Sequence, residues 1–234
     1  MKVKDLFAMG VFYLLMVSIF ISVAYLGSEV TSTLAEFKPL ERDNIIVIDP
    51  GHGGEDGGAI SVSGKMESAY NLEIAQRLND LFHLLGYGTK MVRIYDESVY
   101  TEGHTLAEKK VSDLKNRVQM VNKEENAILV SIHQNTFLDS RYWGAQVFYG
   151  PKGKSRELAE RMQITFCQTL NPGSNREIKK ADGIYLMQHI DCTGILIECG
   201  FLSNPREDAM LQTKQYQQKL CAVIAGTLSQ FLTD

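Results

Sequence analysis

Short runs of apolar, mostly β-branched residues alternate along this chain with longer stretches in which apolar residues recur every three or four positions. The first pattern is typical of strands buried on both faces of a sheet, and the second of amphipathic helices. Strands are predicted at 45–48, 89–94, 127–132, 144–149, 183–187 and 195–197. Helices are predicted at 67–85, 106–122, 155–170 and 215–232. This alternation predicts one α/β domain with a mixed, mostly parallel sheet flanked by helices on both faces.

The N-terminal region differs from this domain in composition. No charged residue occurs from Leu6 to Ser28, and Lys2 and Lys4 precede the run. About 20 apolar helical residues span the hydrocarbon core of a bilayer, and a positive flank stays on the cytoplasmic side. The length of the run favours a membrane anchor over residues 1–28. A cleaved signal peptide and a buried core helix are the alternatives, and either of the first two predicts export.

The remaining chain is divided into a linker at 29–43 and a folded domain at 44–234. Of all 234 residues, 44% are hydrophobic and 22% are charged, and the net charge is -4. These values are ordinary for a globular domain, and they exclude the clustered positive charge of a nucleic-acid-binding protein. The four cysteines form no C-x-x-C pair, so no cysteine metal site or dense disulfide framework is predicted. Pairing of Cys192 with Cys199 stays open.

Two histidines follow predicted strands of the sheet. His52 lies in a glycine-rich loop after the strand at 45–48, and His133 directly follows the strand at 127–132. Ligands of α/β sheets bind beyond the carboxyl ends of strands, so each histidine makes a functional role for the other more plausible. Either one alone could be a structural or solvated residue. A phosphate loop is excluded, because the loop carries neither G-x-x-x-x-G-K-[ST] nor G-x-G-x-x-G.

Two glutamates complete the candidate chemistry. Glu67 begins the predicted helix that follows the glycine-rich loop, where an acidic residue can also simply complement the helix dipole. Glu198 ends the apolar strand at 195–197, and a buried carboxylate is costly unless it is paired or near a metal.

Two imidazoles and one carboxylate, with an open position for water, are the parts of a catalytic zinc site. This donor set suits zinc better than magnesium or calcium. The second carboxylate can take a proton from water and pass it to a leaving amine. His83, His104 and His189 are not expected to be ligands.

Four motifs, in this order, carry a resemblance to a known family. They are Asp49–Gly54, Glu67 with Asn71 and Leu72, Ser131–Asn135, and Glu198 with residues 200–204. From about Asn44 to the C-terminus the chain resembles the zinc-dependent N-acetylmuramoyl-L-alanine amidases of the AmiC type. The resemblance implies that His52, Glu67 and His133 are zinc ligands and that Glu198 is the catalytic carboxylate. It also implies hydrolysis of the amide between N-acetylmuramic acid and L-alanine of peptidoglycan.

The single domain after one apolar segment looks most like the cortex-modifying amidases of spore-forming bacteria, which remove stem peptides on the way to muramic lactam. Where many family members carry lysine after the ligand glutamate, this chain has Ser68. The alternatives are another zinc hydrolase of the cell wall, either a peptidase or a deacetylase, and a non-catalytic wall-binding domain. A cysteine hydrolase using Cys199 and His133 is a weaker alternative. A protein partner that holds the loop-borne ligands in shape is a further hypothesis.

Overall fold

The computed structural model describes residues 15–23 and 43–233. The chain divides into two units, Met1–Glu41 and Arg42–Asp234, and each is described by itself. In the first unit, residues 15–23 form an exposed helix. Over the described residues, no helix is both long and apolar enough to cross a bilayer. Most of the predicted anchor and nearly all of the predicted linker lie outside the described residues.

The second unit is built on one sheet of six strands in the order β2-β1-β3-β6-β4-β5. The strands are β1 (Ile45–Pro50), β2 (Gly88–Met91), β3 (Ala127–Asn135), β4 (Gln146–Tyr149), β5 (Lys179–Lys180) and β6 (Thr193–Phe201). The first four strands in that order run parallel, β4 is antiparallel to β6, and β5 is parallel to β4. The predicted mixed, mostly parallel sheet is therefore confirmed.

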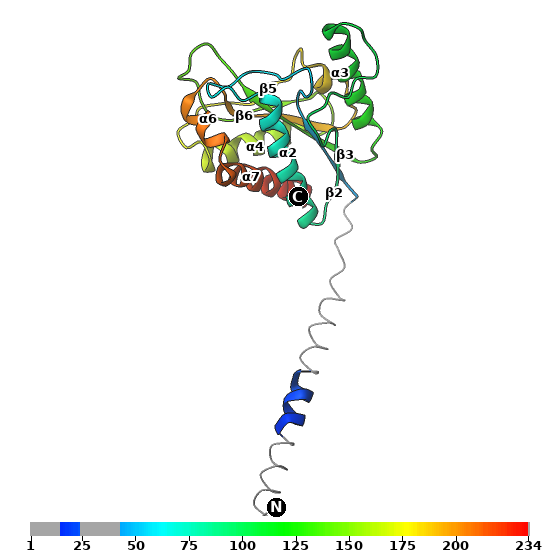
Figure 1. Ribbon diagram of the computed structural model, residues 1–234, viewed down its shortest axis with the longest axis vertical. Helices are drawn as coiled ribbons and strands as arrows, with labels where there is room; N and C mark the ends of the chain where they lie inside the picture. The colour runs from blue at the N-terminus through cyan, green and yellow to red at the C-terminus, as the bar shows by residue number, and fades with distance from the viewer. Residues whose placement is uncertain (1–14, 24–42, 234) are drawn as a thin grey trace, which may run out of the picture. The chain divides into compact units, whose positions relative to one another are not determined.

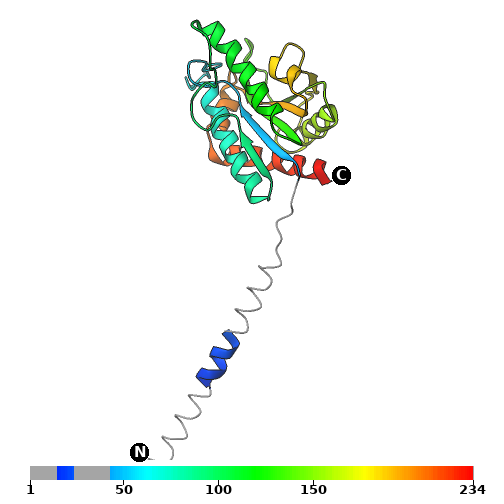
Figure 2. The same cartoon turned by 90° about the vertical axis from the view of Figure 1, so that its right-hand side faces the viewer.

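Helices cover both faces of the sheet (Figures 1 and 2). They are α2 (Glu67–Leu84), α3 (Leu106–Asn122), α4 (Ser155–Thr169), α5 (Tyr185–His189), α6 (Pro205–Leu211) and α7 (Lys214–Thr233). Apolar side chains of α2, α4 and α7 share one core with Ile46 and Ile48 of β1. Val47, between them, packs in a second core with side chains of α3 and α5. Because successive strand residues point to opposite faces, a strand buried on both faces must be apolar throughout.

One predicted strand is wrong. Residues 183–187, expected to be extended, hold a turn and the first residues of α5. Gly183 has a positive φ of 83°, a backbone conformation that interrupts an extended strand. Leu186 and Met187 are buried against the α3 side of the sheet from this short helix, so an apolar run of five residues did not distinguish helix from strand.

Two elements were not predicted. The strand β5 consists of two exposed lysines, a composition that carries no strand signal. The helix α6 does carry a signal that was overlooked: Asn204 caps it by accepting from the backbone N–H groups of Arg206 and Glu207, and Pro205 is its first residue.

Candidate metal centre

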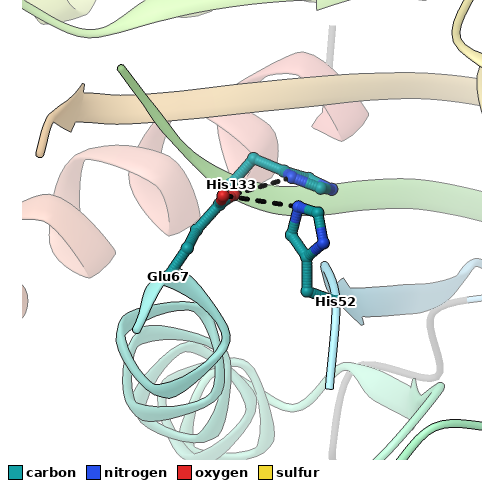
Figure 3. Close-up of side chains that lie close together, drawn as sticks. All are labelled: His52, Glu67 and His133. Carbon is teal, nitrogen blue, oxygen red and sulfur yellow. Dashed lines mark hydrogen bonds and ion pairs between the residues drawn. The ribbon is translucent and has the colours of Figure 1, made fainter. Parts of the chain in front are cut away.

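The structure brings the three predicted metal-binding side chains together at the carboxyl ends of β1 and β3. His52 lies in the loop after β1, His133 lies inside β3 near its end, and Glu67 is the first residue of α2. Glu67 points between the two imidazoles (Figure 3): Oε2 lies 3.3 Å from His52 Nε2, and Oε1 lies 3.0 Å from His133 Nδ1. One possible ligand atom from each residue lies within 4.8 Å of the others. The sequence placed His133 just after its strand, but β3 continues to Asn135.

Glycines of the loop are required because the backbone passes directly against these side chains. A Cβ atom at Gly51 would lie 2.1 Å from His133 Nε2, and one at Gly58 would lie 2.6 Å from Glu67 Oε2. His52 itself takes a φ of 60°, in the left-handed region that residues other than glycine rarely adopt. Strain of this kind persists only where surrounding contacts enforce it.

Backbone groups fix the Glu67 carboxylate. Its Oε2 accepts a hydrogen bond of 3.0 Å from the N–H of Ala59, and its Oε1 accepts one of 3.1 Å from the N–H of Gln134. Burial alone would raise the pKa of Glu67, but hydrogen bonds and charge from His133 and His52 lower it well below its ordinary value. These contacts therefore favour the charged, carboxylate form of Glu67.

A second carboxylate, which the sequence did not single out, flanks His52. Asp56 Oδ2 lies 3.0 Å from His52 Nδ1 and 3.1 Å from Lys110 Nζ. Burial would lower the pKa of His52, but the neighbouring Asp56 and Glu67 raise it to about 9. Two carboxylates around one imidazole thus make this pocket favourable for positive charge. A carboxylate behind a ligating histidine is the usual way to fix the orientation of its ring.

Two buried arginines hold the loop that carries His52. Arg117 donates to Asp49 Oδ1 at 2.6 Å, to Pro50 O at 3.0 Å and to His52 O at 2.8 Å. Arg93 donates to the carbonyl oxygens of Pro50 and Gly51 at 2.9 and 3.1 Å. The loop is therefore held in one conformation by two arginine side chains, Arg93 from the segment after β2 and Arg117 from α3.

Asp49 is the buried counter-ion of this arrangement. It is 1% exposed, and its Oδ2 accepts a hydrogen bond of 2.7 Å from Ser131 Oγ of β3. Burial would raise the pKa of the Asp49 carboxyl, but Arg117 and Ser131 more than offset this and lower it. The family resemblance included Asp49 only as part of a motif. In the structure, Asp49 is the ion-pair partner of Arg117.

Glu198 lies in the strand next to His133. The register pairs the two residues directly, and a β-bulge follows between His133 and Asn135. Such bulges occur next to active sites, where they redirect side chains. Glu198 Oε2 is buried and has no hydrogen-bond partner among the described residues. Burial raises the pKa of Glu198 to about 7, with His133 lowering and Glu67 raising it. The strand runs past Glu198 to Phe201, further than predicted.

The model of one protein family, described as N-acetylmuramoyl-L-alanine amidase, matches residues 46–230. The chain belongs to this family. It is 37% identical over 193 residues to the germination-specific N-acetylmuramoyl-L-alanine amidase of Bacillus subtilis, covering 81% of this chain and 80% of that protein. The resemblance stated from the motifs is confirmed, and with it the assignment of the chain as an amidase.

Solved structures of amidases have the same fold. The CwlD amidase of Clostridioides difficile, solved in complex with the GerS lipoprotein, is 35% identical with a TM-score of 0.77, over 81% of this chain and 98% of that chain. An N-acetylmuramoyl-L-alanine amidase of Clostridium difficile 630 is 28% identical with a TM-score of 0.70, over 82% and 97% of the two chains. The described unit of this amidase therefore corresponds to nearly the whole of both solved chains.

The donor set of the amidase fits a zinc ion. Ligand atoms about 2.0–2.1 Å from a tetrahedral zinc lie roughly 3.3 Å from one another. The measured separations from the Glu67 oxygens to the two histidine nitrogens are 3.3 and 3.0 Å. Two neutral imidazoles and one carboxylate, with Glu198 beside them, match a three-ligand site that leaves one position open.

Cys199 does not fit a nucleophile for the amidase. Its side chain is fully buried, and burial raises the pKa of its thiol well above the ordinary value. A thiolate is the reactive form of cysteine, so the cysteine-hydrolase alternative loses its support. His83 and His189 contact Thr89 Oγ1 and Tyr185 O. His83 is exposed on α2.

Proposed function

We propose that this amidase hydrolyses the amide bond between N-acetylmuramic acid and L-alanine of peptidoglycan, with His52, Glu67 and His133 as zinc ligands and Glu198 as the catalytic carboxylate. The observation that carries the proposal is the position of Glu198. A buried carboxylate oxygen, which has no hydrogen-bond partner within residues 15–23 and 43–233, lies on the strand beside a compact cluster of two histidines and a glutamate. Burying an unpaired carboxylate costs stability, so the presence of Glu198 at this position is better explained by a catalytic role.

A bound zinc ion supplies Lewis-acid chemistry, polarising the scissile carbonyl and activating water. The chain's own residues supply the proton transfers. Glu198, on the strand beside the three proposed ligands, can accept a proton from the attacking water and then donate it to the departing amine. The new C–O bond forms on the lactyl carbonyl carbon, and the C–N bond to L-alanine breaks. The products are a muramic-acid carboxylate and a peptide with a free amino terminus.

The test is product analysis with the full chain in detergent on purified peptidoglycan, with and without added zinc. Mass spectrometry should find peptides with a free N-terminal alanine, and glycan strands without stems, only when zinc is present. Cleavage of a different bond would support another zinc hydrolase, either a peptidase or a deacetylase. Binding of the wall without any cleavage would support the non-catalytic alternative.

The biological setting is inferred from the relatives. The Bacillus subtilis protein is named a germination-specific amidase, and the described unit covers 80% of its length. We infer that this chain acts in maturation of the spore cortex, where stem removal precedes muramic-lactam formation. Spores of a strain without this chain should then have cortex without muramic lactam, and normal muramic lactam would exclude the role.

A protein partner is supported by the CwlD amidase, which was solved with the GerS lipoprotein. We infer a comparable partner for this chain, which would raise its zinc occupancy. Equal zinc content of the purified chain with and without a co-expressed candidate would count against it.

Export and membrane attachment are inferred from residues 1–28 alone. The supporting feature is the uncharged run from Leu6 to Ser28 after two lysines. The catalytic unit should then be outside the cytoplasm and sediment with membranes. Soluble protein in the medium, starting after residue 24, would instead establish a cleaved signal peptide.

A further inference from the structure

A cavity of about 730 Å³ lies against the antiparallel end of the sheet. It is formed by the segment before β4 and the segment between α4 and β5, with Trp143, Gln146, Arg176 and Lys179 among its lining residues. This volume is within the range of small-molecule sites, about 300–1,000 Å³. No residue of the candidate metal centre lines it.

Strand register connects this cavity to Glu198. Glu198 pairs with His133 of β3 on one side and with Gln146 of β4 on the other. Directly paired residues point to the same face, with Cβ atoms about 4.5–5.5 Å apart in an antiparallel pair. His133, Glu198 and Gln146 thus form one row across the sheet. The cavity begins at the end of this row, on the side of Glu198 away from the metal ligands.

Arg176 is held in the cavity wall by its neighbours. Its Nε donates to Trp143 O at 2.7 Å, its Nη1 donates to Gln146 Oε1 at 2.9 Å, and its guanidinium lies 4.4 Å from the centroid of the Phe201 ring. Among the described residues, its Nη2 has no hydrogen-bond partner and no carboxylate forms an ion pair with it. A fixed guanidinium with a free N–H edge is a pre-organised binder of carboxylates.

Among the residues that the structure describes, the other charges around the cavity leave Arg176 and Lys179 without a directly paired carboxylate. Arg141 is neutralised by Asp139, with 2.7 Å between Nη2 and Oδ2. Lys179 is exposed and forms no salt bridge within the described part of the chain. Glu177 contributes one exposed carboxylate, and its backbone oxygen accepts a hydrogen bond from Gln146 Nε2. Arg176 and Lys179 therefore form no ion pair among the described residues, and the nearby carboxylates are those of Glu177 and of buried Glu207, whose charge acts on Arg176 without a direct contact.

The chemistry of Glu198 indicates which part of the substrate reaches this cavity. In the proposed function, on which this inference rests, Glu198 protonates the departing amine, so the peptide lies on its side of the scissile bond. Every peptide ends in a carboxylate. We propose that the cavity is the subsite for the departing stem peptide and that Arg176 and Lys179 bind one of its carboxylates.

The test compares synthetic muramoyl peptides of two to five residues, each prepared as the C-terminal acid and as the C-terminal amide. The zinc-loaded full chain should cleave the acid with a kcat/KM about tenfold higher than the amide at one length, as expected for a charge-assisted hydrogen bond. The corresponding free peptides, measured by calorimetry, should show the same preference in binding affinity. This second measurement does not depend on turnover.

Substitution identifies the groups responsible. Lys179→Gln should lower the ratio of kcat/KM for the acid to kcat/KM for the amide, and Arg176→Gln should reduce this ratio to about one. Lys180→Gln is the matched control, because the next residue of a strand points to the opposite face and Lys180 does not line the cavity. Since Arg176 also contacts Trp143 and Gln146, the Lys179 variant keeps the test valid if Arg176→Gln folds poorly.

Three results would overturn the subsite. Acids and amides could be cleaved and bound equally at every length, which leaves the proposed amidase function standing. The Lys180 variant could lose the preference as much as the Lys179 variant. A peptide-free muramoyl sugar could bind instead and lose affinity on Trp143→Ala, which would assign the cavity to the glycan strand. If the zinc-loaded protein cleaves no muramoyl peptide, the proposed function fails. The subsite is then tested only by whether free peptide acids bind more tightly than the corresponding amides.

Discussion

The two sides of the candidate site are built differently. On the β1 and β3 side, two of the proposed ligands have fixed partners outside the ligand set. Glu67 accepts from two backbone N–H groups, His52 faces Asp56, and two buried arginines hold the loop that carries His52. On the β6 and β4 side, Glu198 Oε2 has no partner among the described residues, and a large cavity opens beyond Gln146.

This difference corresponds to two tasks. Holding an ion requires donor atoms at fixed spacing, and the surrounding contacts provide it. Moving a proton requires a carboxylate that is not already paired, with a pKa near the working pH. Damage on the first side should therefore affect zinc binding and stability. Damage on the second side should affect turnover or substrate binding without loss of zinc.

The largest effect is expected from His133→Ala. Removal of a ligand should abolish zinc retention, and the Lewis-acid contribution of several kcal/mol is lost with it. Since about 1.4 kcal/mol is tenfold in rate, turnover should fall by roughly 10³-fold or more. Zinc content and peptidoglycan hydrolysis are measured on the same sample. His83→Ala is the matched control, and a zinc-free yet active His133 variant would contradict the ligand assignment.

A smaller loss of activity, with no loss of zinc, is expected from Glu198→Gln. The general acid–base contribution is about 10²–10⁴-fold, so turnover should fall by that factor. The zinc-free variant should be at least as stable as the wild type, because a buried, unpaired carboxylate is removed. Turnover, zinc content and the thermal midpoint are measured beside Glu125→Gln, an exposed control outside the cavity. Wild-type turnover would end the proposed role of Glu198.

The stability of the β1 side is tested by Asp49→Asn. Breaking a buried ion pair costs about 3–5 kcal/mol, and the lower end is expected because Arg117 keeps its contact with Asp113 at 2.6 Å. The pKa of Asp49 in the folded protein lies below its unfolded value near 3.9. The Asp49 carboxylate therefore stabilises the fold fully at pH values above the unfolded pKa, and this stabilisation is lost as the pH falls through the folded pKa.

Urea unfolding of the Asp49 variant at pH 7 and pH 3 checks both statements. The gap in unfolding free energy between wild type and variant should be large at pH 7 and narrower at pH 3. Asp182→Asn, at an exposed position, should show no gap at either pH. A gap that widens toward low pH would contradict the ion-pair account.

The smallest effect is expected from Asp56→Asn, which removes the carboxylate behind His52. Loss of such a partner lowers metal affinity by about 10–100-fold. Competition for zinc with a coloured chelator measures this affinity. Glu55→Gln, which changes the neighbouring residue paired with Lys109, is the matched control. Equal affinities of the two variants would show that Asp56 only neutralises Lys110.

Much of the fold was predictable because its signals are local. The sequence patterns identified five of the six strands, all except β5, and helical periodicity identified α2, α3, α4 and α7. The failures were short elements: residues 183–187 carry an apolar run that fits either helix or strand, and β5 is too short and polar to carry any pattern.

The sequence by itself determined the alternation of strands and helices, and it placed His52, His133 and Glu198 near strand ends and Glu67 at the start of a helix. These properties depend on residue periodicity and on chain order. Only the tertiary structure decided that Arg93 and Arg117 hold the loop, that Asp56 within the loop faces His52, and that Gln146 links Glu198 to a cavity. Arg117 lies 65 residues from its partner His52. Which buried polar groups meet over such separations is fixed by sheet register and helix packing, and no local pattern records it.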